Sequence, residues 1–270
     1  MSHHLKVLAT AGLVATRREG NSIFYRRTLP DQACSWAQTL YQRIDQIPLS
    51  PQVQMQIELI QAERDKASRQ FFAANAAKFR AQQDLIASYP VYAEAVAELL
   101  AVTPLPQRRR ALEVGPGEGE FLALLAPRFE QVVALDDAQT MLNKARIFAS
   151  QHSLNNIEFV CGDTRLARSE QAPLDCIVIN MVLHHVPSPA AIFDDVSALL
   201  NPGGALLVCD LCHHDQHWAR EACGDQWLGF EPDDISGWAV AAGLSEGQSQ
   251  YMALRNGFQI QLRQFFKPAV

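Results

Sequence analysis

Short apolar runs recur at regular intervals through the second half of the chain, separated by segments in which apolar residues return every three or four positions. Continuous apolar runs of this length are typical of buried parallel strands, and the intervening pattern is typical of amphipathic helices. The last two runs flank the turn pair Asn256-Gly257, which favours an antiparallel hairpin. The predicted strands are 111–114, 132–135, 157–160, 175–183, 205–211, 247–254 and 258–266. The pattern therefore predicts an α/β fold with a doubly wound sheet and a C-terminal hairpin.

The first 30 residues follow a different pattern. A short helix is predicted from Ser2, with Leu5 and Leu8 on one face and Gly12 at its end. Two β runs, 13–17 and 22–26, follow, joined by residues that tolerate the positive φ of a hairpin turn. We expect a small helix and hairpin that precede the main domain.

Residues 31–102 have a helical pattern broken by prolines. One long helix is predicted from 51 to 79, and its apolar stripe can pack on the following domain or on a second copy of the chain in a homodimer. Pro104 and Pro106 indicate a linker before the first strand. We therefore predict three regions: 1–30, a helical linker or dimerisation region at 31–107, and the main domain at 108–270.

Composition adds cellular context. The chain has 270 residues, 48% of them hydrophobic, with no apolar run long enough to span a membrane and no apolar signal sequence at its start. Its six cysteines show no repeated spacing, so we expect reduced thiols and a cytoplasmic protein without a membrane partner. The net charge is −6, yet residues 1–30 carry five Lys and Arg against one acid, Glu19. This basic end favours a nucleic-acid partner.

Three glycines follow the first predicted strand. Gly115, Gly117 and Gly119 let the backbone approach a ligand closely, as in dinucleotide sites. The third glycine comes one residue too early for that fingerprint, and three carboxylates, Glu113, Glu118 and Glu120, surround the turn. Because carboxylates repel a pyrophosphate, this loop favours a cationic ligand.

Acidic residues also end the next two predicted strands. Asp136 and Asp137 follow 132–135, and Asp163 follows 157–160. The carboxyl ends of parallel strands form the ligand crevice of open α/β sheets, so these side chains are expected to share one pocket. Strand alternation favours Asp136 over Asp137 as the residue that faces the ligand, although the adjacent pair leaves the register open.

These segments resemble the motifs of class I S-adenosylmethionine (SAM)-dependent methyltransferases, of the type 11 or type 25 kind. The resemblance covers residues 108–268 and implies a Rossmann-like seven-stranded sheet with SAM as cofactor and S-adenosylhomocysteine as product or effector. It implies that Asp136 chelates the ribose hydroxyls and that Asp163 accepts from the adenine amino group. The implied cofactor-binding residues are Glu113, Gly115, Gly117, Gly119, Asp136, Asp163 and Asn180.

Histidines provide the candidates for catalysis. His184 and His185 follow the strand whose end faces the sulfonium in that family, and either can act as a base or bind loop backbone. The segment 209–218 is rich in Cys and His but has no second ligand pair at metal-site spacing, so we predict no metal site. Trp218, Trp227 and Phe230 can wall an acceptor pocket or pack in the core.

The N-terminal segment resembles the second half of the DNA-binding domain of ArsR-type winged-helix repressors. The resemblance implies a recognition helix and a wing, and it implies DNA contacts by Ser2, His3, His4, Lys6, Arg17, Arg18 and Arg26. The family places further helices ahead of this point, so we expect that the start codon has been assigned too late or that DNA binding has decayed.

Two functions follow from these patterns. The first is methyl transfer from SAM to an unidentified, small-molecule acceptor. The second is transcription regulation, in which the methyltransferase-like domain senses SAM or S-adenosylhomocysteine and changes the DNA affinity of the winged helix. The cofactor half of the pocket is the same in both, so the sequence leaves both open and favours the enzyme.

Overall fold

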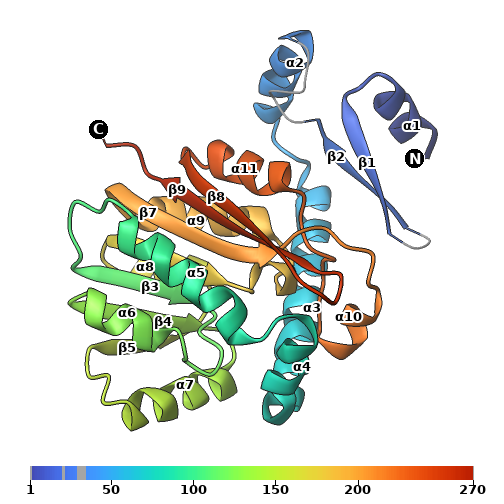
Figure 1. Ribbon diagram of the computed structural model, residues 1–270. Helices are drawn as coiled ribbons and strands as arrows, with labels where there is room; N and C mark the ends of the chain where they lie inside the picture. Colours follow the sequence, from blue (N-terminus) through green and yellow to red (C-terminus); the bar gives the residue numbers. More distant parts are fainter. Residues whose placement is uncertain (1, 20–21, 29–34, 270) are drawn as a thin grey trace. The chain divides into compact units, whose positions relative to one another are not determined.

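The computed structural model describes residues 2–19, 22–28 and 35–269. These residues form two compact units, 1–60 and 61–270 (Figure 1). The predicted boundary at 107 lies inside the second unit. The helices between 61 and 107 are therefore part of the unit that contains the sheet, and the boundary predicted at 30 lies inside the first.

The first unit contains the predicted helix and hairpin. Its described elements are α1 (Ser2–Thr10), β1 (Val14–Glu19), β2 (Ser22–Arg27), α2 (Ser35–Asp45) and the start of α3 (Pro51–Asn75). β1 and β2 pair antiparallel with Val14 opposite Arg27, as predicted, while the turn residues Gly20 and Asn21 lie outside the described residues. On α1, the side chain of Leu8 remains 37% exposed, so the apolar face of this helix is incompletely covered.

The second unit is built on a seven-stranded sheet. Its order is β5-β4-β3-β6-β7-β9-β8, in which β3 to β7 are parallel and β9 runs antiparallel to both β7 and β8. The predicted α/β class and the C-terminal hairpin are confirmed. The strands are β3 (Arg110–Val114), β4 (Gln131–Asp136), β5 (Ile157–Cys161), β6 (Leu174–Asn180), β7 (Leu200–Leu211), β8 (Ser245–Ala253) and β9 (Gln259–Phe266).

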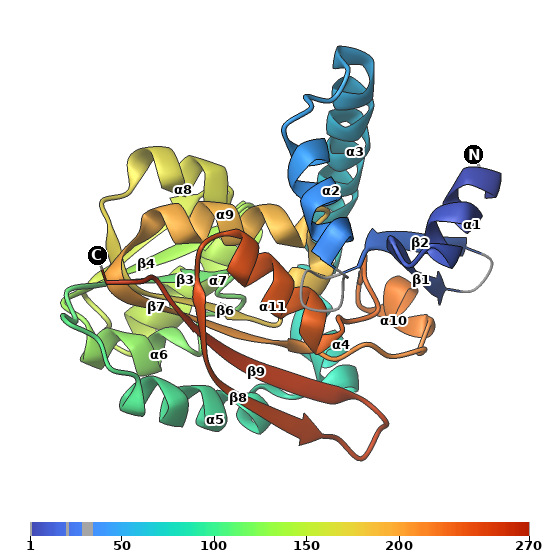
Figure 2. The same cartoon turned by 90° about the horizontal axis from the view of Figure 1, so that it is seen from above.

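Helices cover both faces of this sheet (Figure 2). Helices α5 to α7 pack on one face and α8, α9 and α11 on the other, each over its own apolar cluster. Every residue of β6 is buried, and neighbours such as Ile177 and Val178 enter opposite clusters because strand side chains alternate. The helices are α4 (Phe79–Ile86), α5 (Tyr89–Val102), α6 (Leu122–Leu125), α7 (Gln139–Gln151), α8 (Thr164–Glu170), α9 (Pro189–Leu199), α10 (Trp218–Ala222) and α11 (Pro232–Ala241).

Two predicted helices are shorter than the apolar pattern indicated. The helix after the glycine loop is only α6, four residues long, because Pro127 cannot continue it and the next turn is a 3-10 helix, Ala126–Arg128. The predicted helix 51–79 ends at Asn75, and a 3-10 turn, Ala76–Lys78, separates it from α4. Among the described residues, no helix is both long and apolar enough to cross a membrane.

Candidate functional site

A cleft of about 1210 Å³ opens at the carboxyl ends of β3, β4, β5 and β6 in the second unit. It is lined by five of the predicted cofactor residues: Gly115, Gly117, Asp136, Asp163 and Asn180. Glu113 lines an adjoining cavity of about 800 Å³, which shares Gly115, Gly117 and Asn180 with the cleft. The strand ends thus gather these side chains at one edge of the sheet, which is where open α/β sheets bind ligands.

Two glycines shape the loop that follows β3. Gly115 has a φ of +66° and Gly117 a φ of +57°, a region that side chains other than glycine rarely adopt. A Cβ atom on Gly115 would lie 2.5 Å from Val182 Cγ2, and one on Gly117 would lie 3.2 Å from Phe79. The loop can therefore pass close to the cleft only with glycine at these positions.

Gly119 packs against a neighbouring helix. It is not among the described residues that line the cleft or the adjoining cavity. Its φ is +91°, and a Cβ atom there would lie 2.9 Å from the Ala145 Cα of α7. Gly119 therefore allows the loop to pack against α7, and its part in cofactor binding stays a prediction.

The three carboxylates around the loop are not equivalent. Glu118 binds Lys144 at 2.7 Å and Arg80 at 3.1 Å, and Glu120 binds Arg80 at 2.9 Å. These cations neutralise two of the charges on which the predicted preference for a cationic ligand rested. Within the described part of the chain, only Glu113 of the three has no ion pair, so the preference depends on that residue.

Glu113 is buried at the base of the loop, with 2% of its surface exposed. Burial raises its pKa to about 8, and a weaker interaction with the Asn180 side chain opposes the increase. Among the described residues, Glu113 Oε2 and both polar side-chain atoms of Asn180 lack a hydrogen-bond partner. Buried polar groups are normally paired, so these atoms are suited to bind a polar or cationic ligand.

The acids after β4 and β5 differ in their partners. Asp136 Oδ1 accepts from the Ala138 N–H at 2.8 Å, and burial raises its pKa to about 7, with Asp137 adding to the increase and the Ala138 N–H opposing it. Asp137 lies 3.6 Å from Arg69 in a more exposed ion pair. Asp163 caps α8 by accepting from the Leu166 N–H at 2.9 Å, and it also binds Arg165. Asp136 is therefore the acid with the most free ligand-binding capacity.

The sequence did not reveal that α3 forms one wall of the cleft. Gln61, Asp65, Ser68 and Phe72 line it, and their spacing of three or four residues places them on one helical face. Phe72 makes edge-to-face contacts with Phe79 and His185. This face mixes polar and apolar residues, so a search for an apolar stripe passes over it. Ile57 and Ile60, further toward the start of the same helix, are 38% and 53% exposed.

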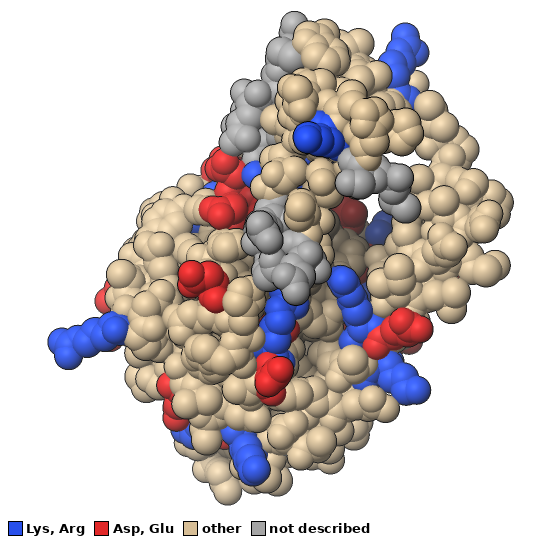
Figure 3. All heavy atoms as spheres, turned by 90° about the vertical axis from the view of Figure 1, so that its right-hand side faces the viewer, with Lys and Arg blue, Asp and Glu red and all other residues tan. Residues whose placement is uncertain are grey.

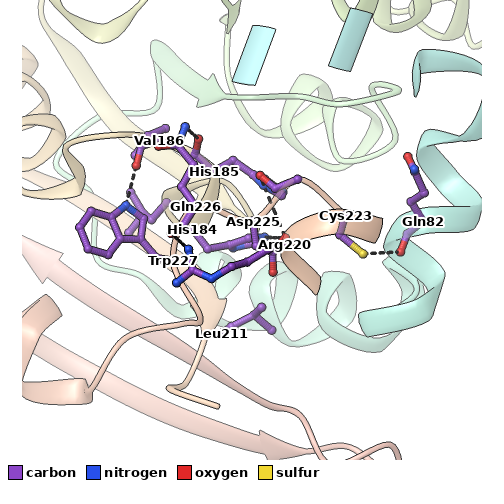
Figure 4. Close-up of polar contacts among 12 residues, drawn as sticks. Gln82, His184, His185, Val186, Leu211, Arg220, Cys223, Asp225, Gln226 and Trp227 are labelled. Carbon is purple, nitrogen blue, oxygen red and sulfur yellow. Dashed lines mark hydrogen bonds and ion pairs between the residues drawn. The ribbon is translucent and has the colours of Figure 1, made fainter. Parts of the chain in front are cut away.

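The two candidate catalytic histidines lie in different surroundings (Figure 4). His184 is 2% exposed, and its Nδ1 lies 2.7 Å from Asp210. Burial alone would lower its pKa, but Asp210 and Asp225 outweigh burial and raise it to about 9. His185 lines the cleft, and burial together with the His184 charge holds its pKa well below 6.5. Neither histidine therefore keeps a pKa near the ordinary value of 6.5, and of the two only His185 lines the cleft.

Three aromatic residues were predicted either to wall an acceptor pocket or to pack in the core, and two of them pack in the core. Phe230 is buried in the core, Trp227 packs against the same cluster, and Trp218 is 41% exposed. None of them is among the described residues that line the cleft. The aromatic and apolar residues that do line the cleft include Phe72, Met181 and Val186.

The predicted DNA-contacting residues belong to the first unit. His3, His4 and Lys6 are exposed on α1, and Arg26 is partly buried. The side chains of Ser2, Arg17 and Arg18 lie outside those that the structure describes. On the face drawn in Figure 3, the described Lys and Arg side chains are interspersed with Asp and Glu and form no continuous basic surface.

Comparison with known families agrees with this geometry. The profile of a family described as "Methyltransferase domain" matches residues 82–244, which is more than half of the chain. The chain belongs to this methyltransferase family. The match begins in α4 and ends after α11, so it includes the cleft residues at all four strand ends. SAM is the cofactor of this methyltransferase domain, as the sequence predicted.

Individual relatives cover part of the methyltransferase domain. Trans-aconitate 2-methyltransferase of Methylobacterium radiotolerans is 39% identical over 114 residues, which are 42% of this chain and 42% of that protein. The tRNA 5-carboxymethoxyuridine methyltransferase of Escherichia coli K12 is 31% identical over 103 residues, 37% of this chain and 40% of that protein. The chain thus matches less than half the length of these curated relatives.

Solved structures share the fold. N-methyltransferase NodS from Bradyrhizobium japonicum, in complex with S-adenosylhomocysteine, superposes with a TM-score of 0.53 at 17% identity. The similarity covers 71% of this chain and 98% of that chain. This agreement concerns the Rossmann-like architecture of the second unit.

Proposed function

We propose that this chain transfers a methyl group from SAM to a small-molecule acceptor. The observation that carries the proposal is the buried Glu113 carboxylate, which lies with unpaired Asn180 atoms beside a glycine loop. When bound, SAM supplies an electrophilic methyl group on a positively charged sulfonium. A site with free buried acceptors and little room for Cβ atoms fits such a cationic nucleoside.

Each acid has a proposed part in binding the cofactor. Asp136 accepts hydrogen bonds from the ribose hydroxyls in preference to Asp137, because Arg69 already occupies Asp137. Glu113 and Asn180 bind the amino-acid end of the cofactor. Asp163 accepts a hydrogen bond from the adenine through the carboxylate lone pairs that the Leu166 N–H and Arg165 do not use. Gly119 is left out of the cofactor-binding set.

The chain contributes to the reaction mainly by positioning. Methyl transfer is an in-line displacement, and alignment of acceptor and methyl group supplies much of the rate. The ring of Phe72 packs against His185 and walls the acceptor side of the cleft, where it excludes water. His184 is held in an ion pair with Asp210, so it does not serve as the base that takes the acceptor proton.

The test is calorimetric titration of the purified chain with SAM and with S-adenosylhomocysteine, followed by assays with methyl-labelled SAM and a panel of acceptors. We expect micromolar affinity for both ligands and transfer of label to at least one acceptor. Absence of binding by either ligand would refute the proposal. Strong preference for S-adenosylhomocysteine without any turnover would favour a sensor over an enzyme.

The affinity for SAM should depend on pH through Glu113 and Asp136. Their pKa values, about 8 and about 7 in the free protein, mean that both carboxyls are largely protonated at pH 6. Ionised Glu113 attracts the cationic ligand, and ionised Asp136 accepts the ribose hydroxyls. The affinity should therefore fall as the pH drops from 8 to 6, approaching tenfold per pH unit below about pH 8 for Glu113 and below about pH 7 for Asp136. Titrations at pH 6, 7 and 8 would show this. Glu113→Gln should flatten the dependence, and an affinity unchanged across this range would contradict it.

A second candidate function, ligand-dependent DNA binding, is supported by the first unit. Helix α1 followed by the β1–β2 hairpin has the order of a recognition helix and wing, and His3, His4 and Lys6 are exposed. Titration with duplex DNA at low salt, with and without S-adenosylhomocysteine, tests it. We expect binding that weakens with salt and that Lys6→Ala reduces. Equal signals for wild type and Lys6→Ala would refute it.

A further inference from the structure

A cluster of three potential metal ligands lies behind the acceptor side of the cleft. His184, His185 and Asp225 each offer one ligand atom, and these atoms all lie within 4.8 Å of one another. Asp225 Oδ1 is 3.9 Å from His184 Nε2 and 3.7 Å from His185 Nδ1. Two ligands of a tetrahedral ion about 2 Å from each lie about 3.3 Å apart. The ligand atoms, here up to 4.8 Å apart, would therefore have to move together, and His185 Nδ1 would have to give up its 3.3 Å contact with the Gly224 carbonyl.

Asp225 is unusual because neither carboxylate oxygen accepts a hydrogen bond from a described residue, although Oδ1 lies within ion-pair distance of the two histidines. Its side chain is fully buried, yet among the described residues Oδ1 and Oδ2 have no hydrogen-bond partner. A buried carboxylate is costly unless a cation or hydrogen-bond donors compensate it. The loop that carries it is fixed in place, since the backbone N–H groups of Gln226 and Trp227 donate to the His184 carbonyl at 2.8 and 3.1 Å (Figure 4).

Asp210 supplies the outer partner that metal-binding histidines commonly have. Its Oδ1 lies 2.7 Å from His184 Nδ1, and its Oδ2 accepts from the Leu183 N–H at 2.8 Å. This arrangement fixes the His184 ring and leaves Nε2 directed toward Asp225. A carboxylate behind the ligating histidine orients the ring and raises its basicity.

We propose that His184, His185 and Asp225 bind a divalent transition-metal ion, of which Zn²⁺ best suits two imidazoles and one carboxylate. Three protein ligands leave a fourth position for an exogenous ligand. His184 and His185 line a small cavity that shares Phe72, Met181 and His185 with the cleft, so the three ligands lie next to the proposed methyl-transfer site.

The metal ion indicates that the methyl acceptor is a hydroxyl compound. This step rests on the proposed methyl transfer. A hydroxyl acceptor bound at the fourth position would release its proton to water, since the ion stabilises the oxyanion. The oxygen electron pair would then form the bond to the methyl carbon, while the electron pair of the broken methyl–sulfur bond stays on sulfur. His185 would serve as a ligand and not as the base.

Metal content is the direct test. The chain without an affinity tag is stripped with a chelator, reconstituted with Zn²⁺, desalted and measured by atomic emission. We expect about one Zn²⁺ per chain, and Co²⁺ substitution should give the intense visible bands of a four-coordinate site. Asp225→Asn should weaken Zn²⁺ binding at least tenfold, and Asp210→Asn by about 10- to 100-fold.

Controls separate this site from other histidines. The double variant His3→Ala with His4→Ala, and the variant His217→Ala, remove exposed imidazoles and should retain the Zn²⁺. Zinc below stoichiometry in the wild type would overturn the proposal and leave a metal-free ion triad of His184 with Asp210 and Asp225. Zinc lost in the controls but kept in Asp225→Asn would also overturn it. SAM titration of each variant is a readout independent of Zn²⁺ content. Retained SAM binding shows that the variant is folded, and it tests cofactor binding separately from metal binding.

Discussion

Replacing Asp136 with asparagine should weaken SAM binding by about 10- to 100-fold, which corresponds to about 1.5 to 3 kcal/mol for a lost charged hydrogen bond. The carboxylate has Oδ2 free for the ribose hydroxyls, while its Oδ1 accepts from Ala138. Asparagine keeps the shape but loses the charge and one acceptor. Calorimetry or competition with a fluorescent nucleoside would measure the change.

The neighbouring acid provides the matched control. Asp137 lines the same cleft but pairs with Arg69 at an exposed position, and exposed ion pairs contribute little. Asp137→Asn should therefore change SAM affinity less than threefold. A larger loss in Asp137→Asn than in Asp136→Asn would reverse the register that we favour.

Gly119→Ala should destabilise the second unit by about 2 to 4 kcal/mol. The φ of +91° penalises a side chain, and the added Cβ would lie 2.9 Å from the Ala145 Cα, a backbone atom that cannot move without shifting α7. In thermal unfolding, we expect a decrease in melting temperature of about 5 to 15 °C. Because Gly119 does not line the cleft, SAM affinity of the folded fraction should stay close to that of the wild type.

The variant Gly243→Ala separates the effect of the positive φ from the effect of a steric contact. Its φ is +80°, but a Cβ atom there would have no neighbour within 4 Å. Gly243→Ala should therefore cost only the conformational term, about 1 to 2 kcal/mol. If both variants lose the same stability, the contact with Ala145 contributes nothing and the role we assign to Gly119 is wrong.

The sequence predicted the sheet well because its signals are local. A fully buried strand such as β6 needs an unbroken apolar run, and the hairpin of β8 and β9 needs the Asn256-Gly257 turn. The five cleft residues were also predictable, because each lies at the carboxyl end of a strand or within three residues after it. Local patterns thus predict both the strands and the residues at their carboxyl ends.

Contacts between distant segments escaped the prediction. The pairing of Glu118 with Arg80 spans 38 residues, and the approach of Asp225 to His185 depends on how the loop after α10 folds back. No pattern near Asp225 marks it as different from an ordinary loop acid. The helical face of α3 was missed for a related reason. Its polar residues line a cleft, but in the sequence they cannot be distinguished from the polar residues of a solvent-exposed helix face.

The wall that α3 provides has a kinetic consequence. None of the described side chains of α3 is buried, although Gln61 to Phe72 border the cofactor cleft. Segments with few buried contacts open locally at a small free-energy cost, while the central strands open only on global unfolding. We therefore expect amide hydrogens at 61–75 to exchange rapidly in the free protein and more slowly with the cofactor bound. We also expect opening of this helix, rather than of the sheet, to limit the release of the product.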